Sequence, residues 1–316
     1  MIGIDDIRAA QDRIGGRVRR TPVIEASELK TPVADGAALT LKLELLQVTG
    51  SFKARGATNR LLATPPDILA NGIVAASGGN HGLATARAGH MAGVQATIFL
   101  PGNVSPAKVE KLHRWGAETV IVGSVWDEAN AAALDFVEKT GAAYFHPFAD
   151  PLVVAGQGTV GLELLDQLPE IETVIIAIGG GGLISGASTA IKALAPHVRI
   201  IGVEAEGSPT LKRSLEAGHT VTLDRVTTAV PTLACSRTDD RIYDLVAQNV
   251  DEIVLVSDAE MQDAAEWLWF EMGLAADLSG AAALAALQCG RIEVAAGAKI
   301  CAIVCGAGPD GVMPPR

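Results

Sequence analysis

Short runs of β-branched and aliphatic residues alternate along the whole chain with longer alanine-rich stretches, and this alternation restricts the possible folds more than any other feature. We expect the short runs to form strands at 73–77, 95–100, 118–123, 173–178, 199–205, 252–257 and 299–304. The longer stretches predict helices at 4–14, 51–62, 81–92, 106–115, 126–139, 153–167, 183–194, 259–272 and 280–290. Strands that alternate with helices are typical of parallel sheets covered by helices, so we predict an α/β protein.

The chain is longer than one hydrophobic core usually fills, at 316 residues, so we expect two lobes, each a mainly parallel twisted sheet flanked by helices. The proline-bearing segment HPFADP, at 146–151, separates the first three expected strands from the last four. We therefore predict a large domain formed by residues 1–49 and 148–316, and a small domain formed by residues 50–147. The small domain is expected to be mobile, because it would have to close on a ligand to exclude water.

Composition excludes several classes of partner. A formal net charge of -11 opposes binding to a phosphate backbone, so we expect no nucleic-acid partner. No apolar run approaches the ~20 residues that a membrane span requires, so we expect no membrane contact. The acidic residues near the start are unlike an export signal. The cysteines lack CxxC spacing and nearby histidines, which argues for reduced thiols in a cytoplasmic protein and against structural zinc; they are Cys235, Cys289, Cys301 and Cys305.

The segment GGGGLISG, at 179–186, follows an expected strand and begins an expected helix. Consecutive glycines let several backbone N–H groups point at one anion, and the helix dipole lies behind them, so we predict a phosphate-binding loop. The segment lacks the Gly-Lys-Ser/Thr ending of a Walker A loop, and it does not fit G-x-G-x-x-G in any register. Glu204 nevertheless ends the next strand where a ribose-binding acid would lie, so a nicotinamide-nucleotide-binding protein remains an alternative.

The segment SGGNHG, at 77–82, is a second glycine-rich turn between a strand and a helix. Its amides and polar side chains suit a small carboxylate, although an ordinary asparagine helix cap is an equal alternative. Lys53, in TGSFKARGA, lies in the first turn of an expected helix, where the helix dipole favours loss of its proton. A phosphate loop, an amine nucleophile and a carboxylate loop together indicate pyridoxal phosphate bound to Lys53, and an amino-acid substrate.

Several motifs in the same order resemble the fold-type II pyridoxal-phosphate enzymes, specifically the serine/threonine dehydratase (threonine ammonia-lyase) and serine racemase group. These motifs are KLELLQVTGSFKARGA (42–57), SGGNHG, AGQGT (155–159), GGGG and the final CG, so the resemblance covers nearly the whole chain. It implies the two-domain architecture shared with the β subunit of tryptophan synthase, and commonly a homodimer. It also implies an ammonia-lyase that eliminates the hydroxyl of a β-hydroxy amino acid; an amino-acid racemase and a β-replacement enzyme are the alternatives.

The resemblance also assigns residues to the cofactor. It implies that Lys53 forms the Schiff base and later moves the α-proton, that Phe52 packs against the cofactor ring, and that Asn80 binds its 3-hydroxyl. Cys305 would lie beside the pyridine nitrogen. The phosphate would be bound by Gly179, Gly180, Gly181, Gly182 and Leu183.

The remaining assignments concern the substrate and a metal. The substrate carboxylate would be held around Ser77, Gly78, Asn80 and His81, and Ser236 would face the substrate. Serine racemases have a serine at the position of Gly78, so we expect weak or absent racemisation. The segment Ala234-Cys235-Ser236 replaces Ala-Asp-Gly, which leaves the identity of the β-hydroxy amino acid open. We expect no metal; Glu204 is a weak candidate for a divalent-cation ligand found in part of the family.

Overall fold

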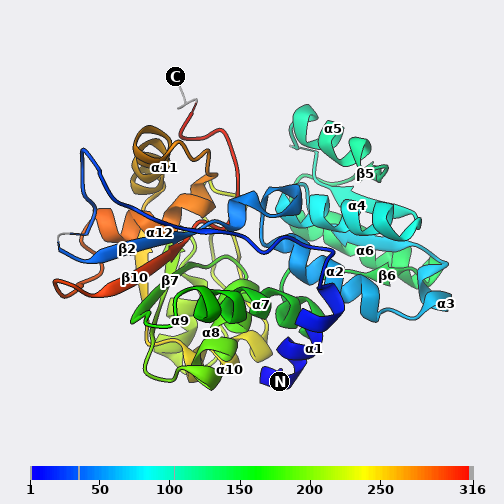
Figure 1. The fold of residues 1–316 in the computed structure, drawn as a ribbon. Helices are drawn as coiled ribbons and strands as arrows, with labels where there is room; N and C mark the ends of the chain where they lie inside the picture. Colours follow the sequence, from blue (N-terminus) through cyan, green and yellow to red (C-terminus); the bar gives the residue numbers. More distant parts are fainter. Residues whose placement is uncertain (1, 35, 103, 313–316) are drawn as a thin grey trace.

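The protein is described by a computed structural model that covers residues 2–34, 36–102 and 104–312. Two sheets form separate lobes, a six-stranded sheet with the order β1-β2-β10-β7-β8-β9 and a four-stranded sheet with the order β5-β4-β3-β6 (Figure 1). The strands are β1 (Val23–Glu25), β2 (Ala38–Lys42), β3 (Ile73–Ala76), β4 (Ala96–Leu100), β5 (Glu118–Ile121), β6 (Ala143–Tyr144), β7 (Thr173–Ala177), β8 (Arg199–Ala205), β9 (Glu252–Val256) and β10 (Lys299–Ile303).

The helices connect and cover these strands. The α-helices are α1 (Ile4–Ile14), α2 (Lys53–Ala63), α3 (Pro66–Leu69), α4 (Asn80–Ala92), α5 (Pro106–Arg114), α6 (Trp126–Thr140), α7 (Pro151–Gln167), α8 (Gly182–Leu194), α9 (Thr210–Ala217), α10 (Asp240–Asn249), α11 (Asp258–Met272) and α12 (Leu278–Gln288). Two 3-10 turns, η1 (Glu44–Leu46) and η2 (Val48–Gly50), precede α2. Among the described residues, no helix combines the length and the apolar character that crossing a bilayer takes.

The six-stranded sheet is parallel except at its edge, where β1 runs antiparallel to β2. α12 covers one face, and α7 with α8 covers the other (Figure 1). A strand buried on both faces needs a continuous apolar run, and TVIIA in β7 is buried throughout. β10 pairs in parallel with β7, so the segments that follow these two strands, which contain Cys305 and Gly179, lie at the same edge of the sheet.

The four-stranded sheet is entirely parallel and is built from one continuous part of the chain. β3, one of its two inner strands, is completely buried and leads into the SGGNHG turn. α2 packs against both α4 of this lobe and α7 of the other lobe, and therefore lies between the two sheets (Figure 1). This position places the first residue of α2, Lys53, where the lobes meet.

The predicted α/β class and all the expected strands and helices are present, with ends that differ by about two residues at most. The short strands β1, β2 and β6 and the helices α3, α9 and α10 were not predicted. The exact domain boundaries at 49/50 and 147/148 and the mobility of the small domain stay predictions.

Candidate active site

Lys53 is the first residue of α2, and its ammonium group donates a hydrogen bond of 2.8 Å to the backbone oxygen of Pro147. Its Nζ atom also lies 5.1 Å from the centre of the Phe52 ring. No carboxylate pairs with Lys53 among the described residues. Burial of the amine is the main cause that lowers the pKa of Lys53 to about 8. The Lys53 amine is therefore fixed in position by the Pro147 oxygen, and it loses its proton far more readily than the amine of an exposed lysine.

A strained turn leads the chain into this helix. Thr49 has a φ of 67° and Gly50 has a φ of 85°, both in the left-handed region. The turn brings Ser51 into a bridge with Gly306, and the amide of Phe52 donates a hydrogen bond of 3.3 Å to the oxygen of Cys305. The start of α2 is thus fixed against the segment that follows β10. Lys53 and Cys305, although far apart in the sequence, become neighbours.

Cys305 is buried at the carboxyl end of β10, and its thiol donates to the backbone oxygen of Ser279 at 3.4 Å. Burial is the largest effect on this thiol, followed by the nearby carboxylate of Asp277, and both raise the pKa of Cys305. The thiol is therefore neutral at physiological pH. It can donate or accept a weak hydrogen bond, but it cannot supply a negative charge to a neighbouring ring.

The four glycines after β7 form a cradle that only glycine can make. A Cβ atom at Gly179 would lie 2.5 Å from the oxygen of Thr232, and one at Gly180 would lie 2.1 Å from a ring carbon of Phe148. Gly181 has a φ of 91°, in the left-handed region. Among the described residues, the amides of Gly179, Gly180 and Gly181 have no acceptor. Free amides at the start of α8 fit the predicted binding of a phosphate.

The second turn begins α4, and its asparagine reaches the other lobe. The side-chain amide of Asn80 donates a hydrogen bond of 3.0 Å to a carboxylate oxygen of Asp277. Asp277 is the N-cap of α12 and also accepts from the amide of Gly280. A Cβ atom at Gly306 would lie 3.0 Å from the Asn80 amide nitrogen. Asn80 and the segment after Cys305 are therefore adjacent, as the prediction of a shared cofactor site requires.

The His81 imidazole is oriented by a backbone oxygen. Its Nε2 atom lies 2.8 Å from the oxygen of Phe145 and must donate, because a carbonyl only accepts. Nδ1 is buried and has no partner among the described residues. Burial and the charge of Lys53 lower the pKa of His81 to about 3, so the ring is neutral. A neutral ring with a lone pair at Nδ1 does not attract a carboxylate, so His81 can offer a carboxylate its backbone amide rather than its side chain.

Ser77 and Gly78 precede this helix. The Ser77 hydroxyl accepts from the amide of Gly79 at 3.3 Å. A Cβ atom at Gly78 would lie 3.0 Å from Val104 and 3.3 Å from Leu100, so a side chain there would press on both. The backbone at the start of α4 is therefore tightly enclosed on the side of β4.

Glu204 has a structural role in the described structure. Its carboxylate oxygens accept from the amides of Leu211, at 2.8 Å, and Lys212, at 2.9 Å, at the start of α9. Burial raises the pKa of Glu204 to about 7. Among the described residues, no group of three or more His, Cys, Asp or Glu side chains is placed to hold a metal ion.

The structure also identifies neighbours that the sequence did not single out. Pro147 and Phe148 connect the two halves of the site, since Pro147 holds Lys53 and Phe148 contacts the glycine cradle. The Thr232 methyl lies 3.7 Å from the position of a Cβ atom at Gly79, and its oxygen borders Gly179. Ser236 is four residues further along, and its backbone oxygen accepts from Leu223. The proline-bearing segment at 146–151 was the only sequence feature that pointed to Pro147 and Phe148. No feature of the sequence pointed to Thr232.

Comparison with known proteins identifies a family and several similar enzymes. The family described as pyridoxal-phosphate dependent enzyme matches residues 14–306. The chain is 39% identical to an L-threonine ammonia-lyase of Thermotoga maritima over 310 residues, which are 98% of this chain and 76% of that protein. It is 37% identical to a phenylserine dehydratase of Ralstonia pickettii over 308 residues, 96% of this chain and 92% of that protein. The structure of maize serine racemase has a TM-score of 0.91 and 36% identity, and the match covers 96% of this chain and 93% of that one.

Proposed function

The chain belongs to the family of pyridoxal-phosphate-dependent enzymes, and we propose that it is an ammonia-lyase acting on a β-hydroxy amino acid. The products are a 2-oxo acid and ammonia. The observation that carries the proposal is the placement of Lys53, an amine whose pKa is lowered to about 8, beside the neutral thiol of Cys305. Relatives named for threonine and for phenylserine both act on β-hydroxy amino acids, which supports this substrate class.

The residues present fit pyridoxal phosphate. The free amides of the glycine cradle, with Leu183 behind them in α8, suit its phosphate. Phe52 would pack against its ring, and Asn80 would bind its 3-hydroxyl. Lys53 would bind its aldehyde carbon covalently, and Cys305 would lie beside its ring nitrogen. The cofactor, when bound, withdraws electrons from the substrate's α-carbon and so weakens the α-C–H bond.

Lys53 performs the proton transfer in this proposal. As a neutral amine, its Nζ atom takes the α-proton of the substrate. The β-carbon–oxygen bond then breaks, and the hydroxyl leaves as water once it has gained a proton. A water molecule later replaces the nitrogen, so that one 2-oxo acid and one ammonia are formed per amino acid. The hydrogen bond from Nζ to the oxygen of Pro147 holds the amine in position before the cofactor binds.

The substrate carboxylate is assigned to the start of α4. The amides of Asn80 and His81 lie in the first turn of the helix, where the dipole favours an anion, and the Ser77 hydroxyl lies at the turn before it. The neutral His81 ring maintains the path of this turn through its bond to Phe145. Gly78 fits the enclosed backbone before this helix, where a side chain would press on Val104 and Leu100. Ser236, and Thr232 close to Gly79, are the proposed contacts from the opposite lobe.

A spectrum and a substrate panel test this function. The purified protein should show an absorbance band near ~410–420 nm that depends on Lys53, because a lysine-bound cofactor absorbs there. Release of 2-oxo acid should then be scored with serine, threonine, phenylserine and other β-hydroxy amino acids. A protein that binds the cofactor but releases no 2-oxo acid from any of them would contradict the proposed lyase.

The same panel separates the alternatives. Change of optical rotation without 2-oxo acid would indicate the racemase, and consumption of an added nucleophile would indicate the β-replacement enzyme. Gly78 argues against racemisation, since no hydroxyl side chain is present at that position. The alternative of a nicotinamide-nucleotide-binding protein does not hold for a member of this family.

We further propose a cytoplasmic homodimer in which the small domain, residues 50–147, closes over the substrate. Four free cysteines suit a reducing compartment. Sedimentation and fractionation test the assembly and the location. A divalent cation at Glu204 has little support, because both carboxylate oxygens already accept from backbone amides. Addition of magnesium or calcium should therefore leave the rate unchanged.

A further inference from the structure

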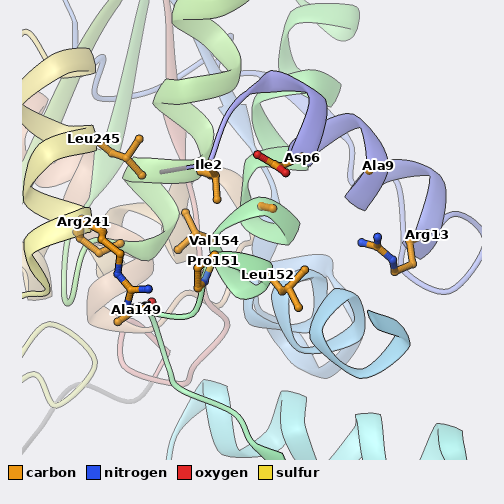
Figure 2. Close-up of a pocket in the computed structure, with 12 residues that line it drawn as sticks. Ile2, Asp6, Ala9, Arg13, Ala149, Pro151, Leu152, Val154, Arg241 and Leu245 are labelled. Atoms are coloured by element: carbon orange, nitrogen blue, oxygen red, sulfur yellow. Dashed lines mark hydrogen bonds between the residues drawn. The ribbon is translucent and has the colours of Figure 1, made fainter. Parts of the chain in front are cut away.

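A cavity of about 210 Å³ lies between α1, the start of α7 and α10, and no residue of the candidate active site lines it (Figure 2). Its floor is aliphatic and includes Leu152, Val154, Ile242 and Leu245. The volume is below the ~300–1,000 Å³ of pockets for drug-sized ligands, so it suits a small metabolite. The apolar floor favours a ligand with a hydrocarbon body.

The rim of the cavity carries two arginines with different environments (Figure 2). Arg241 is paired with the carboxylate of Asp239 at 2.8 Å. Arg13 has only a neutral partner, the side-chain oxygen of Asn59 at 2.5 Å, and no carboxylate pairs with it in the part of the chain that the structure describes. Asp6 lies on the same rim as Arg13. The unmatched charge of Arg13 therefore favours an anion at its end of the cavity.

Both arginines contact the segments that hold Lys53. Asn59, the partner of Arg13, lies on α2, the helix that begins at Lys53, and its amide also donates to the oxygen of Leu152 at 2.7 Å. Arg241 donates to the oxygen of Ala149 at 2.9 Å. Ala149 is two residues beyond Pro147, whose oxygen accepts the hydrogen bond from Lys53. A ligand that moves Arg13 would disturb α2, the helix that begins at Lys53. A ligand that moves Arg241 would disturb the segment that contains Pro147, the hydrogen-bond partner of Lys53.

We propose that this cavity binds a small carboxylate with an aliphatic body, and that its binding regulates the enzyme. The carboxylate binds Arg13 and takes the place of Asn59, and the hydrocarbon body covers Leu152 and Leu245. Release of Asn59 loosens the contact of α1 with α2 and lowers turnover. Coupling between sites typically changes binding affinity by about 5- to 150-fold, so an effect of the ligand on substrate binding should be measurable.

The binding test uses 4-methylpentanoate, which has neither the amino nor the oxo group expected of an active-site ligand. Titration calorimetry of the holoenzyme should show one equivalent bound. Arg13→Met, which removes the charge, and Ala9→Trp, which fills the cavity from α1, should each weaken binding by at least about tenfold. Arg8→Met is the matched control, because Arg8 lies on the same helix and does not line the cavity; it should bind as the parent does.

L-leucine provides the second arm. It shares the carboxylate and the hydrocarbon body but adds an ammonium group, which Asp6 could accept. Tighter binding of leucine that is lost in Asp6→Asn would extend the site to amino acids; equal or weaker binding would restrict it to simple carboxylates. Either result supports a carboxylate site, provided that Arg13→Met abolishes it.

The outcomes that overturn the proposal are separate from those that overturn the lyase. Absence of binding at millimolar concentration, or binding that survives both Arg13→Met and Ala9→Trp, would eliminate the site. Binding with no change in turnover, measured with whichever amino acid proves to be the substrate, would eliminate the regulation. Calorimetry needs no turnover, so a failure of the proposed reaction leaves the binding test intact. The melting temperature of each variant and its absorbance from bound cofactor confirm that it is folded.

Discussion

The side-chain amide of Asn80 donates a hydrogen bond of 3.0 Å to the carboxylate of Asp277, so the first turn of α4 is connected to the N-cap of α12. The two helices pack on different sheets. Asp277 accepts at the same time from the hydroxyl of Ser279, at 2.7 Å, and the amide of Gly280, at 2.6 Å. Burial raises the pKa of Asp277, and these donors oppose that effect. One carboxylate therefore caps a helix and, across the lobes, fixes Asn80, the side chain proposed to bind the cofactor.

Two substitutions separate these roles. Asp277→Ala removes the cap as well as the contact with Asn80, and loss of a cap typically costs ~1 kcal/mol of stability. Asp277→Ser keeps a capping oxygen but is too short to reach Asn80, so its unfolding free energy should remain close to that of the parent. Both variants should bind pyridoxal phosphate more weakly, because Asn80 is no longer held. Urea unfolding and cofactor titration measure the two effects; full cofactor affinity in the serine variant would show that the contact is dispensable.

Lys53 should reduce stability while it enables catalysis. Lys53→Met should abolish 2-oxo acid release. At pH 7 both the folded and the unfolded parent carry a proton on Lys53, and burial of that charge costs folding about 3 kcal/mol, from the shift of 10.5 to about 8. The cofactor-free variant should therefore be more stable by up to about that amount below pH 8. The unfolded chain binds the extra proton between pH 8 and 10.5, so the parent regains stability there and the difference disappears.

The measurement is chemical unfolding of the cofactor-free proteins at several pH values. Lys212→Met is a suitable control, because Lys212 also donates to a backbone oxygen, that of Ile253 at 3.0 Å, far from Lys53 in the sequence. It should show no comparable gain. A gain for Lys53→Met that persists unchanged at pH 11 would have to come from packing and not from the buried charge.

The glycine cradle should tolerate no side chain at Gly180. A Cβ atom there would overlap the Phe148 ring at 2.1 Å, so Gly180→Ala should lower stability and cofactor affinity together. Phe148→Ala in the same protein should restore part of the affinity, because it removes the atoms that clash. Gly15→Ala is the control, since a Cβ atom there would make only ordinary contacts, at 3.4 Å and 3.5 Å, with backbone oxygens of the described residues. Failure of Phe148→Ala to rescue binding would mean that the loop backbone, and not the ring, is disturbed.

The sequence was sufficient to predict those elements of the fold whose structure is determined by neighbouring residues in the chain. The buried run of β7, the glycines after it and the apolar spacing of the helices are each readable from a few neighbouring residues. The short strands β1 and β6 were not readable, because their few residues are placed by their partners rather than by their own periodicity. Tertiary context decides such elements.

The contacts within the site depended even more on tertiary structure. The role proposed for Lys53 follows from its motif, but the hydrogen bond from Lys53 to the Pro147 oxygen depends on a residue 94 positions away. The orientation of the His81 ring depends on the Phe145 oxygen, which no sequence pattern reveals. Thr232 borders the glycine cradle through its backbone oxygen, and that contact is independent of its side-chain type. Interactions with backbone atoms leave no signal in the residues that make them.

Thr49 combines a strained backbone conformation with a side-chain hydroxyl that makes no hydrogen bond to the described residues. A β-branched residue at φ 67° costs about 1–3 kcal/mol, and the buried Oγ1 atom has no partner among the described residues. Thr49→Gly removes both costs and should raise the unfolding free energy by ~1 kcal/mol, less than the strain because glycine loses more entropy on folding. Thr49→Val removes only the hydroxyl and keeps the strain, so it should be less stable than the glycine variant. Urea unfolding gives the order; a valine variant as stable as the glycine variant would show that the turn is unstrained. Steady-state kinetics then show whether the hydroxyl serves the substrate, since a raised KM in both variants, with the fold intact, requires a role for that oxygen.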